Sequence, residues 1–426
     1  MTSADDAETY RRRGLLAAAG TAVLASLGGC SALADVSPDR HHESDADLSG
    51  PGATWPGKMG GSARRSAVSR ALPDAARGRG VDGLSGVGRR RPVVGPDALV
   101  AAGEAVRLPG DDDPAGRVVA VDRETGDVRW QYRLSNANTY PAVAGDTVFA
   151  QGDRLVALDR RDGRLRWRYD VGYAWWQTAP TPARGTLLVT AAEPEAVWGL
   201  DPSTGRRRWA AGLSGREPRG LAADPHGAAY VASAAPEERR GSLFRIDPAD
   251  GTVRWRRPAP TDPVTPVAGP TRVYVHADGR LVARHADDGA LAWRRSLPRV
   301  VRRGGPALGP ERCFVVSRDD DGDGRLYALR RDDGATDWRG PTVPVPPVAA
   351  GAVTVTDDRV YVPVTAGETS GADSDTGPGL AALDPATGQR VATLALPGHP
   401  ATGAAVGDGG GALVVDDGSD RLVALG

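Results

Sequence analysis

The chain has 426 residues, with 53 Lys or Arg against 54 Asp or Glu, so its formal net charge is −1. Because a nucleic-acid-binding protein normally carries a basic face, this balance excludes nucleic acid as the expected partner. The length alone suggests two or three ordinary domains. Only two cysteines occur, Cys30 and Cys313, so a modification of Cys30 would leave no disulfide within the chain.

The first 29 residues read as an export signal. Their apolar, Ala-rich stretch ends at Leu27 and is too short to persist as a membrane-spanning helix. Arg12-Arg13 before Gly-Leu-Leu resembles a twin-arginine motif, and Leu27-Gly-Gly-Cys30 resembles a lipobox, in which the cysteine thiol is acylated. We therefore expect residues 1–29 to be a signal peptide and Cys30 to carry a lipid. An ordinary signal peptide with an incidental cysteine is the alternative.

Residues 30–54 are polar and show no hydrophobic periodicity, which predicts a flexible tether. The folded domain is expected over residues 55–426. A lipid at Cys30 would hold the protein at a bilayer without spanning it. The exported protein should then lie on the outer face of the cytoplasmic membrane, or on the periplasmic side if the cell has an outer membrane.

From Val118 onward one short pattern recurs seven times. A hydrophobic strand, often ending in Ala-x-Asp, leads to a turn closed by Gly, and Trp follows four residues later. A repeat of about 40 to 50 residues with strand-like content predicts the blades of a β-propeller. The turn glycines are Gly126, Gly163, Gly205, Gly251, Gly289, Gly334 and Gly388. The tryptophans are Trp130, Trp167, Trp209, Trp255, Trp293 and Trp338, and Ala392 takes their place in the last copy.

Each copy predicts a blade of four strands. The Gly suits a hairpin turn that needs positive φ. Upstream of each copy lies a second apolar run, such as 147–150 or 186–190, and before it a short Pro-containing segment. Because one blade cannot bury both of its faces, we expect the Trp to fill the gap between neighbouring blades, and the contact beside Ala392 to be weaker.

The chain ends on a half copy, Arg421–Leu425, without an outer strand. An exposed sheet edge is a hazard, so we expect an N-terminal segment between about Gly80 and Pro92 to pair with it. The predicted fold is therefore all-β, an eight-bladed β-propeller of four-stranded antiparallel blades, closed by pairing of N-terminal and C-terminal segments. Seven blades are the alternative, with residues 402–426 completing the seventh.

The pattern A-x-D-x-x-T-G-x-x-x-W resembles the pyrroloquinoline-quinone (PQQ)-type repeat over nearly all of residues 90–426, and the segment that starts at Trp55 is similar to the opening segment of that family. The family includes quinoprotein dehydrogenases and binding-only lipoproteins. In overall plan the chain looks like the propeller lipoprotein of the outer-membrane protein assembly machinery. This resemblance implies a lipid-anchored, non-catalytic scaffold that binds another envelope or membrane protein, and we expect a monomer.

The rival function is that of a PQQ-dependent dehydrogenase. In such enzymes the resemblance implies a quinone over a Trp floor, a ring of adjacent cysteines and a Ca²⁺ ion. This chain has no adjacent cysteine pair and no C-x-x-C-H haem motif, and its blades are close to minimal length. We therefore expect no catalysis and no PQQ, and assign the repeated tryptophans to blade packing.

Loops that lead from one blade's outer strand to the next blade's inner strand carry the expected binding residues. Adjacent aromatic side chains there could hold a protein or a sugar, so a carbohydrate-binding propeller is a further alternative. Trp175 or Trp176 could instead begin an inner strand and belong to the core. The expected partner-binding residues are Asn138, Tyr140, Tyr173, Trp175, Trp176, Arg216, Arg219, Arg299, Arg302 and Arg303.

A separate acidic pattern, Asp319, Asp321 and Asp323 before Gly324, fits the first half of a Ca²⁺ loop. The twelfth position of that loop holds Arg330 where a bidentate Glu is required. We expect an acidic hairpin, with a Ca²⁺ site as the alternative. Cys313 begins an apolar strand and is expected to be a small buried side chain without chemistry.

Overall fold

The structure, a computed structural model, describes strands and the turns around them. All described residues belong to the unit Ser37–Gly426. No described residue lies in a helix, and none therefore forms a helix that could span a membrane. The described ranges are 78–80, 92–94, 98–106, 115–122, 125–137, 140–170, 178–191, 195–235, 240–260, 265–277, 279–297, 299–300, 305–318, 324–343, 353–365, 378–396, 405–406, 412–415 and 422–425.

The described residues form eight antiparallel sheets, numbered 1 to 8 in chain order. Sheet 1 contains β2 (Val93–Val94), β3 (Ala98–Val106), β4 (Ala115–Asp122) and β5 (Val128–Arg133), and sheet 2 contains β6 (Ala142–Ala144), β7 (Thr147–Gln151), β8 (Leu155–Asp159) and β9 (Leu165–Tyr169). Sheet 3 contains β10 (Thr181–Ala183), β11 (Thr186–Ala191), β12 (Ala196–Leu200) and β13 (Arg207–Gly212), and sheet 4 contains β14 (Glu217–Ala223), β15 (Ala229–Ala235), β16 (Arg240–Ile246) and β17 (Val253–Ala259).

The later sheets repeat this order, with one addition in sheet 6. Sheet 5 contains β18 (Val267–Ala268), β19 (Arg272–Ala277), β20 (Arg280–His285) and β21 (Leu291–Ser296). Sheet 6 contains β22 (Arg299–Val300), β23 (Ala307–Leu308), β24 (Arg312–Arg318), β25 (Gly324–Arg330) and β26 (Thr336–Val343), with both β22 and β23 paired to β24. Sheet 7 contains β27 (Thr354–Val355), β28 (Val360–Val364), β29 (Gly379–Leu383) and β30 (Arg390–Ala395). Sheet 8 contains β31 (Ala405–Val406), β32 (Ala412–Val415), β33 (Leu422–Leu425) and β1 (Gly78–Gly80).

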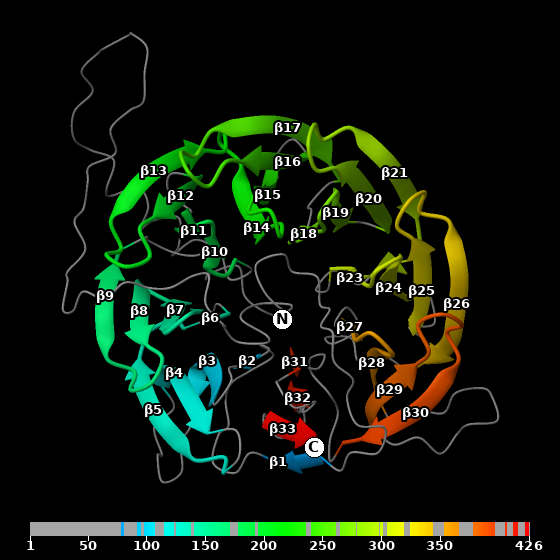
Figure 1. The fold of residues 1–426 in the computed structure, drawn as a ribbon, viewed down its shortest axis with the longest axis horizontal. Coiled ribbons are helices and arrows are strands. Elements are labelled where there is room, and N and C mark those ends of the chain that lie inside the picture. The colour runs from blue at the N-terminus through cyan, green and yellow to red at the C-terminus, as the bar shows by residue number, and fades with distance from the viewer. Residues whose placement is uncertain are drawn as a thin grey trace, which may run out of the picture. The chain divides into compact units, whose positions relative to one another are not determined.

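The strand order confirms the prediction made from the repeat: a short strand, two longer strands, a Gly turn and an outer strand. Figure 1 shows the short first strands toward the middle of the described unit and the Trp-bearing last strands at its periphery. First strands of consecutive sheets contact one another, as β6 does with β10 and β10 with β14. Described residues that come just before a first strand, such as Tyr140 and Arg216, therefore lie at the inner side of the sheets.

Side-chain and backbone hydrogen bonds together close the repeat turn. In sheet 3 the Gly205 amide donates to the Asp201 carbonyl at 2.8 Å, and six other turns have the same bond. The Asp201 carboxylate accepts hydrogen bonds from the amides of Ser203 and Thr204, at 2.9 and 3.0 Å, and from the Arg208 guanidinium at 2.7 Å. Such an Asx-type turn explains why Asp precedes the Gly in most copies.

We expect Asp201→Asn to remove a contribution to stability that depends on pH. Burial opposes the charged form of Asp201, but hydrogen bonds from Ser203, Arg208 and Thr204 outweigh it and lower its pKa to about 2. Since the unfolded pKa is about 3.9, the charged group stabilises the fold fully above that value and less as pH falls toward 2. In thermal unfolding between pH 6 and pH 2, the variant should melt lower at pH 6 and approach the wild type at the acid end. A deficit that stays constant would contradict this.

The repeated Trp joins each sheet to the next one in the chain. The Trp167 indole N–H, on β9, donates to the Pro202 carbonyl in the turn of sheet 3 at 2.8 Å. The Trp167 ring covers Gly205, whose φ is 71°, so closely that a Cβ there would lie 2.6 Å from the ring. The prediction that the Trp fills the gap between neighbouring sheets is confirmed at six places. The six ring and glycine pairs are Trp130 with Gly163, Trp167 with Gly205, Trp209 with Gly251, Trp255 with Gly289, Trp293 with Gly334 and Trp338 with Gly388.

Apolar clusters also join each sheet to the next one in the chain. Each of the six clusters of buried residues in the described part combines side chains from two consecutive sheets, from sheets 1 and 2 through sheets 6 and 7. Phe149 and Trp167 of sheet 2, for example, share a cluster with Leu187 and Leu200 of sheet 3. The core thus lies between sheets, because a single sheet has no apolar layer of its own to cover it.

Sheet 8 departs from the repeat where the chain ends meet. The partner of β33 is β1, with Gly78 opposite Leu425 and Gly80 opposite Val423. The partner comes from the N-terminal side, as predicted, but it begins two residues before the expected segment. Because β33 and β1 come from distant parts of the chain, no repeat turn joins these two strands.

Candidate functional site

Four of the predicted partner-binding residues lie within the described residues, beside or in first strands. Tyr140 comes two residues before β6, and Arg219 is part of β14. Arg299 is part of β22, where Arg318 lies opposite it in the ladder. Arg216 comes directly before β14 and is 8% exposed. The structure therefore places these residues on sheets 2, 4 and 6, in or just before the first strand of each sheet.

These four residues come from three different sheets. Arg219 pairs with Glu217 of its own strand, at 3.0 Å, so much of its charge is balanced locally. Tyr140 is half-buried. If these residues bind one partner, they do so as separate points on the inner side of three sheets. We call this set (Tyr140, Arg216, Arg219 and Arg299) the inner rim.

The other predicted site residues lie outside the described ranges and stay predictions. They are Asn138, Tyr173, Trp175, Trp176, Arg302 and Arg303 for partner binding, Cys30 for lipidation, and Asp319, Asp321 and Asp323 for Ca²⁺. Among the residues that the structure does describe, no group of three or more His, Cys, Asp or Glu side chains could hold a metal ion.

The repeated tryptophans are engaged between sheets. All six indole N–H groups donate to a turn carbonyl of the following sheet, at 2.8 to 3.1 Å. Their rings cover the turn glycines that come just before the last strand of the following sheet. These six side chains therefore pack between sheets, as the repeat predicted.

Cys313 is completely buried on β24, beside Tyr274 in one apolar cluster. Burial raises the pKa of its thiol to about 12, with a smaller opposing effect from the Arg331 charge. A neutral, inaccessible thiol is a poor nucleophile. The thiol is free in the described structure, and its packing agrees with the prediction of a small buried side chain.

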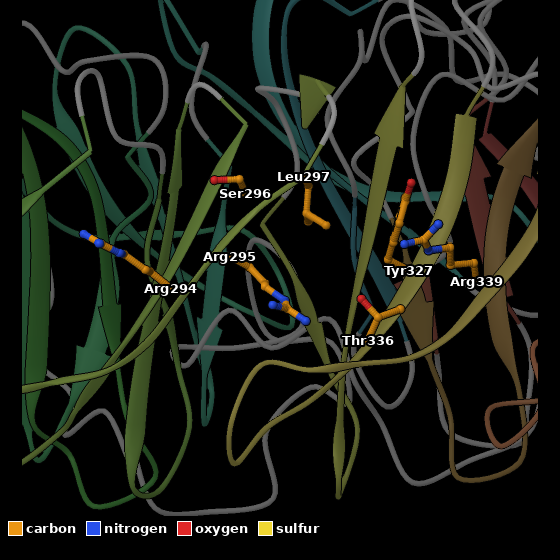
Figure 2. A pocket seen from close by; sticks show the side chains of 7 residues that line it. All are labelled: Arg294, Arg295, Ser296, Leu297, Tyr327, Thr336 and Arg339. Atoms are coloured by element: carbon orange, nitrogen blue, oxygen red, sulfur yellow. The ribbon is translucent and has the colours of Figure 1, made fainter.

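A pocket that the sequence did not predict lies on the outer side, between sheets 5 and 6. It has a volume of about 540 Å³. Figure 2 shows Arg295 and Arg339 extending from opposite sides toward the space between them, and Arg294 directed away. Successive residues of a strand point to opposite faces, which accounts for the different directions of Arg294 and Arg295. The lining residues are Arg294, Arg295, Ser296, Leu297, Tyr327, Thr336 and Arg339.

One side of this pocket is preorganised. The Arg339 guanidinium carbon lies 5.6 Å from the centre of the Tyr327 ring, within the range of a cation–π contact. Tyr327 is only 8% exposed, so the ring is a fixed support for the guanidinium. The available sequence signal was the arginine two residues after Trp293, a position at which most copies carry an apolar or small side chain.

Comparison with known proteins agrees with the repeat. A family model described as outer membrane protein assembly factor BamB matches residues 114–267 and 239–426. No protein of curated function matches the chain.

Three similar solved structures give the fold. A quinohemoprotein alcohol dehydrogenase from Comamonas testosteroni has 14% identity and a TM-score of 0.64, over 88% of this chain and 80% of that chain. BamB from Moraxella catarrhalis has 16% identity and a TM-score of 0.52, over 77% of this chain and 91% of that chain. The quinohemoprotein alcohol dehydrogenase ADHIIG from Pseudomonas putida HK5 has 12% identity and a TM-score of 0.60, over 88% and 80%. At such identities the likeness establishes a β-propeller fold alone.

Proposed function

The chain belongs to the family of outer membrane protein assembly factor BamB, and from this premise we propose that it is a non-catalytic propeller scaffold of the cell envelope. Its partner would be another envelope or membrane protein, held at the inner rim and the loops beside it. The observation that carries the proposal is the engagement of all six repeated tryptophans between sheets. A binding scaffold needs this architecture and no catalytic group.

We propose further that the eight sheets are eight blades of one closed ring. The antiparallel pairing of β1 with β33 supports this, because it joins the two ends of the repeat region in one sheet. The contact of β2 with β31 supports it as well, since these strands belong to sheets 1 and 8. In a closed ring, sheets 1 and 8 would cover each other's faces, as consecutive sheets do elsewhere in the described unit.

The place in the cell is part of the same proposal. The Arg12-Arg13 pair and Cys30 support export with the signal peptide 1–29, followed by lipid anchoring at Cys30 and a tether over residues 30–54. The propeller 55–426 would then stand outside the cytoplasm, as a monomer held near a membrane by one lipid group. Ca²⁺ and PQQ have no part in this proposal.

Photo-crosslinking in native membranes tests the scaffold. A photoreactive residue in place of Tyr140 or Arg299 should capture one and the same partner protein, because both positions lie beside inner strands. Matched labels at Val253 and Val391, which are 41% and 51% exposed on the outer strands of sheets 4 and 7, should not capture it. Trp176→Ala combined with Arg302→Ala should reduce the capture.

Two results would contradict the scaffold proposal. One is equal capture from the inner rim and from the outer strands, which would show contact without a defined site. The other is dye-linked alcohol oxidation by the purified full chain after addition of PQQ and Ca²⁺, which would make the chain an enzyme.

A further inference from the structure

The repeat position two residues after the Trp is different at the boundary between sheets 5 and 6 from the same position in the other sheets. The residue two places after the repeated Trp faces the following sheet, as Tyr169 shows by contacting Trp198 of sheet 3 with ring centres 6.0 Å apart. In most sheets this residue is apolar or small, and in sheets 1 to 3 it packs at the apolar cluster shared with the following sheet. The residues at this position are Tyr132, Tyr169, Ala211, Arg257, Arg295, Gly340 and Leu394.

Only Arg295 is exposed among these seven described residues. The other arginine, Arg257, is half-buried and donates to the carbonyls of Arg256 and Asp288, at 3.0 and 2.6 Å. Arg295 has no recorded carboxylate or carbonyl partner in the described part of the chain. A groove that other sheets fill is therefore open here, with a cation on one wall.

The opposite wall carries a second cation. Arg339 lies over the Tyr327 ring, which supports the guanidinium, and its N–H groups have no acceptor among the described contacts. The nearest carboxylate in sequence to the pocket wall, Asp337, is already paired with Arg312 at 2.6 Å. Because the lining set contains no Asp or Glu, the positive charge of the pocket is not balanced from within.

We propose that this pocket binds a phosphate group, with Arg295 and Arg339 donating to it from opposite walls. Guanidinium groups match the oxygens of phosphate with paired hydrogen bonds. The hydroxyl groups of Ser296 and Thr336 also line the pocket and can donate to further oxygens. A tetrahedral phosphate can accept from both walls at once, whereas a planar carboxylate presents its two oxygens in one direction.

The volume indicates an ester rather than a bare ion. About 540 Å³ is within the range of small-molecule sites, so the pocket can hold the organic group beside the phosphate. The side chain of Leu297 is half-buried at the edge and offers an apolar contact for that group. The phosphate ester could be a soluble metabolite or a phospholipid headgroup, because both present the same chemistry.

Calorimetric titration of the full chain with glycerol 3-phosphate tests whether the pocket binds a phosphate ester. Flotation of the full chain with phosphatidylcholine vesicles, prepared with and without phosphatidylglycerol, shows whether that ester is a lipid headgroup. Binding of the soluble ester alone indicates a metabolite, and binding to either kind of vesicle indicates a headgroup, because both phospholipids present a phosphate ester. Arg295→Ala and Arg339→Ala should each weaken the observed binding about tenfold or more, since a charge-assisted hydrogen bond contributes about 1.5 to 3 kcal/mol.

Arg256→Ala is the matched control. Arg256 follows its Trp directly, as Arg339 does, and lies over Phe244 at 5.4 Å. Between sheets 3 and 4, however, the position that corresponds to Arg295 is Ala211, which is buried in one cluster with Phe244. This variant should bind as the wild type does, and Arg295→Lys should retain part of the affinity. Unfolding midpoints of the variants confirm that each is folded. If neither ligand binds, or if Arg256→Ala weakens binding as much as Arg295→Ala, the proposal is wrong.

Discussion

Trp167→Ala is expected to lower the free energy of unfolding by about 3 to 5 kcal/mol, the range for a large aromatic side chain removed from a core. Trp167 is fully buried, lies 5.9 Å from Phe149 between ring centres, and belongs to the cluster that joins sheets 2 and 3. Its loss leaves a cavity between two sheets and an unpaired carbonyl at Pro202. Urea denaturation followed by tryptophan fluorescence and circular dichroism measures the change.

Trp167→Phe separates the ring from the hydrogen bond. Phenylalanine keeps an aromatic side chain in the gap but cannot donate to the Pro202 carbonyl, so we expect a smaller loss of about 1 to 3 kcal/mol. A loss below 1 kcal/mol for Trp167→Ala would show that the sheets hold together without this contact. That result would also mean that packing between sheets does not explain the repeated Trp.

Gly205→Ala is the second large effect, and we expect a loss of about 2 to 5 kcal/mol. Alanine in the left-handed region costs about 1 to 2 kcal/mol, and overpacking a filled site adds about 1 to 3. The φ of Gly205 is 71°, and an added Cβ would lie 2.6 to 2.7 Å from the Trp167 ring. The ring is enclosed and cannot move aside. Thermal and urea unfolding both report this loss.

Gly185→Ala is a matched control in the same sheet. Its φ is 70°, and no heavy atom lies within 4 Å of the added Cβ. The control therefore carries the backbone strain without the collision, and we expect about 1 kcal/mol. Equal losses for Gly185→Ala and Gly205→Ala would contradict the idea that the ring selects Gly at the repeat turn.

Much of the fold could be predicted because its constraints are local and repeated. Gly205, Asp201 and Trp167 each follow from a turn or a packing contact that recurs at one spacing. Seven copies make such a pattern visible in a single sequence. The pairing of β1 with β33 was predicted only approximately, since Gly-Arg-Gly carries no hydrophobic pattern to locate a strand.

The outer pocket was missed for a physical reason. Its side chains come from β21, β25 and β26, and only the stacking of sheets 5 and 6 brings them together. Arg295 reads in the sequence as one more exposed arginine on an outer strand. Its exposure becomes informative only when the same repeat position is compared between sheets, because Tyr169 and Gly340 are buried there.

The inner rim was located by topology and not by chemistry. The prediction came from the rule that loops before first strands reach the inner side, and the structure shows Arg219 in β14, Arg299 in β22 and Tyr140 two residues before β6. The rule does not say which side chains pair locally. The ion pair between Arg219 and Glu217 is an example, because it forms between two side chains on the same face of one strand.

The central claim is that Trp and Gly of consecutive sheets form one packing unit, and a double-mutant cycle between Trp167→Ala and Gly205→Ala tests it most directly. With the ring removed, the added Cβ has no collision, so Gly205→Ala should cost only about as much as Gly185→Ala, near 1 kcal/mol. The cycle should then show a coupling of about 1 to 3 kcal/mol. Losses that simply add in the double variant would contradict the claim.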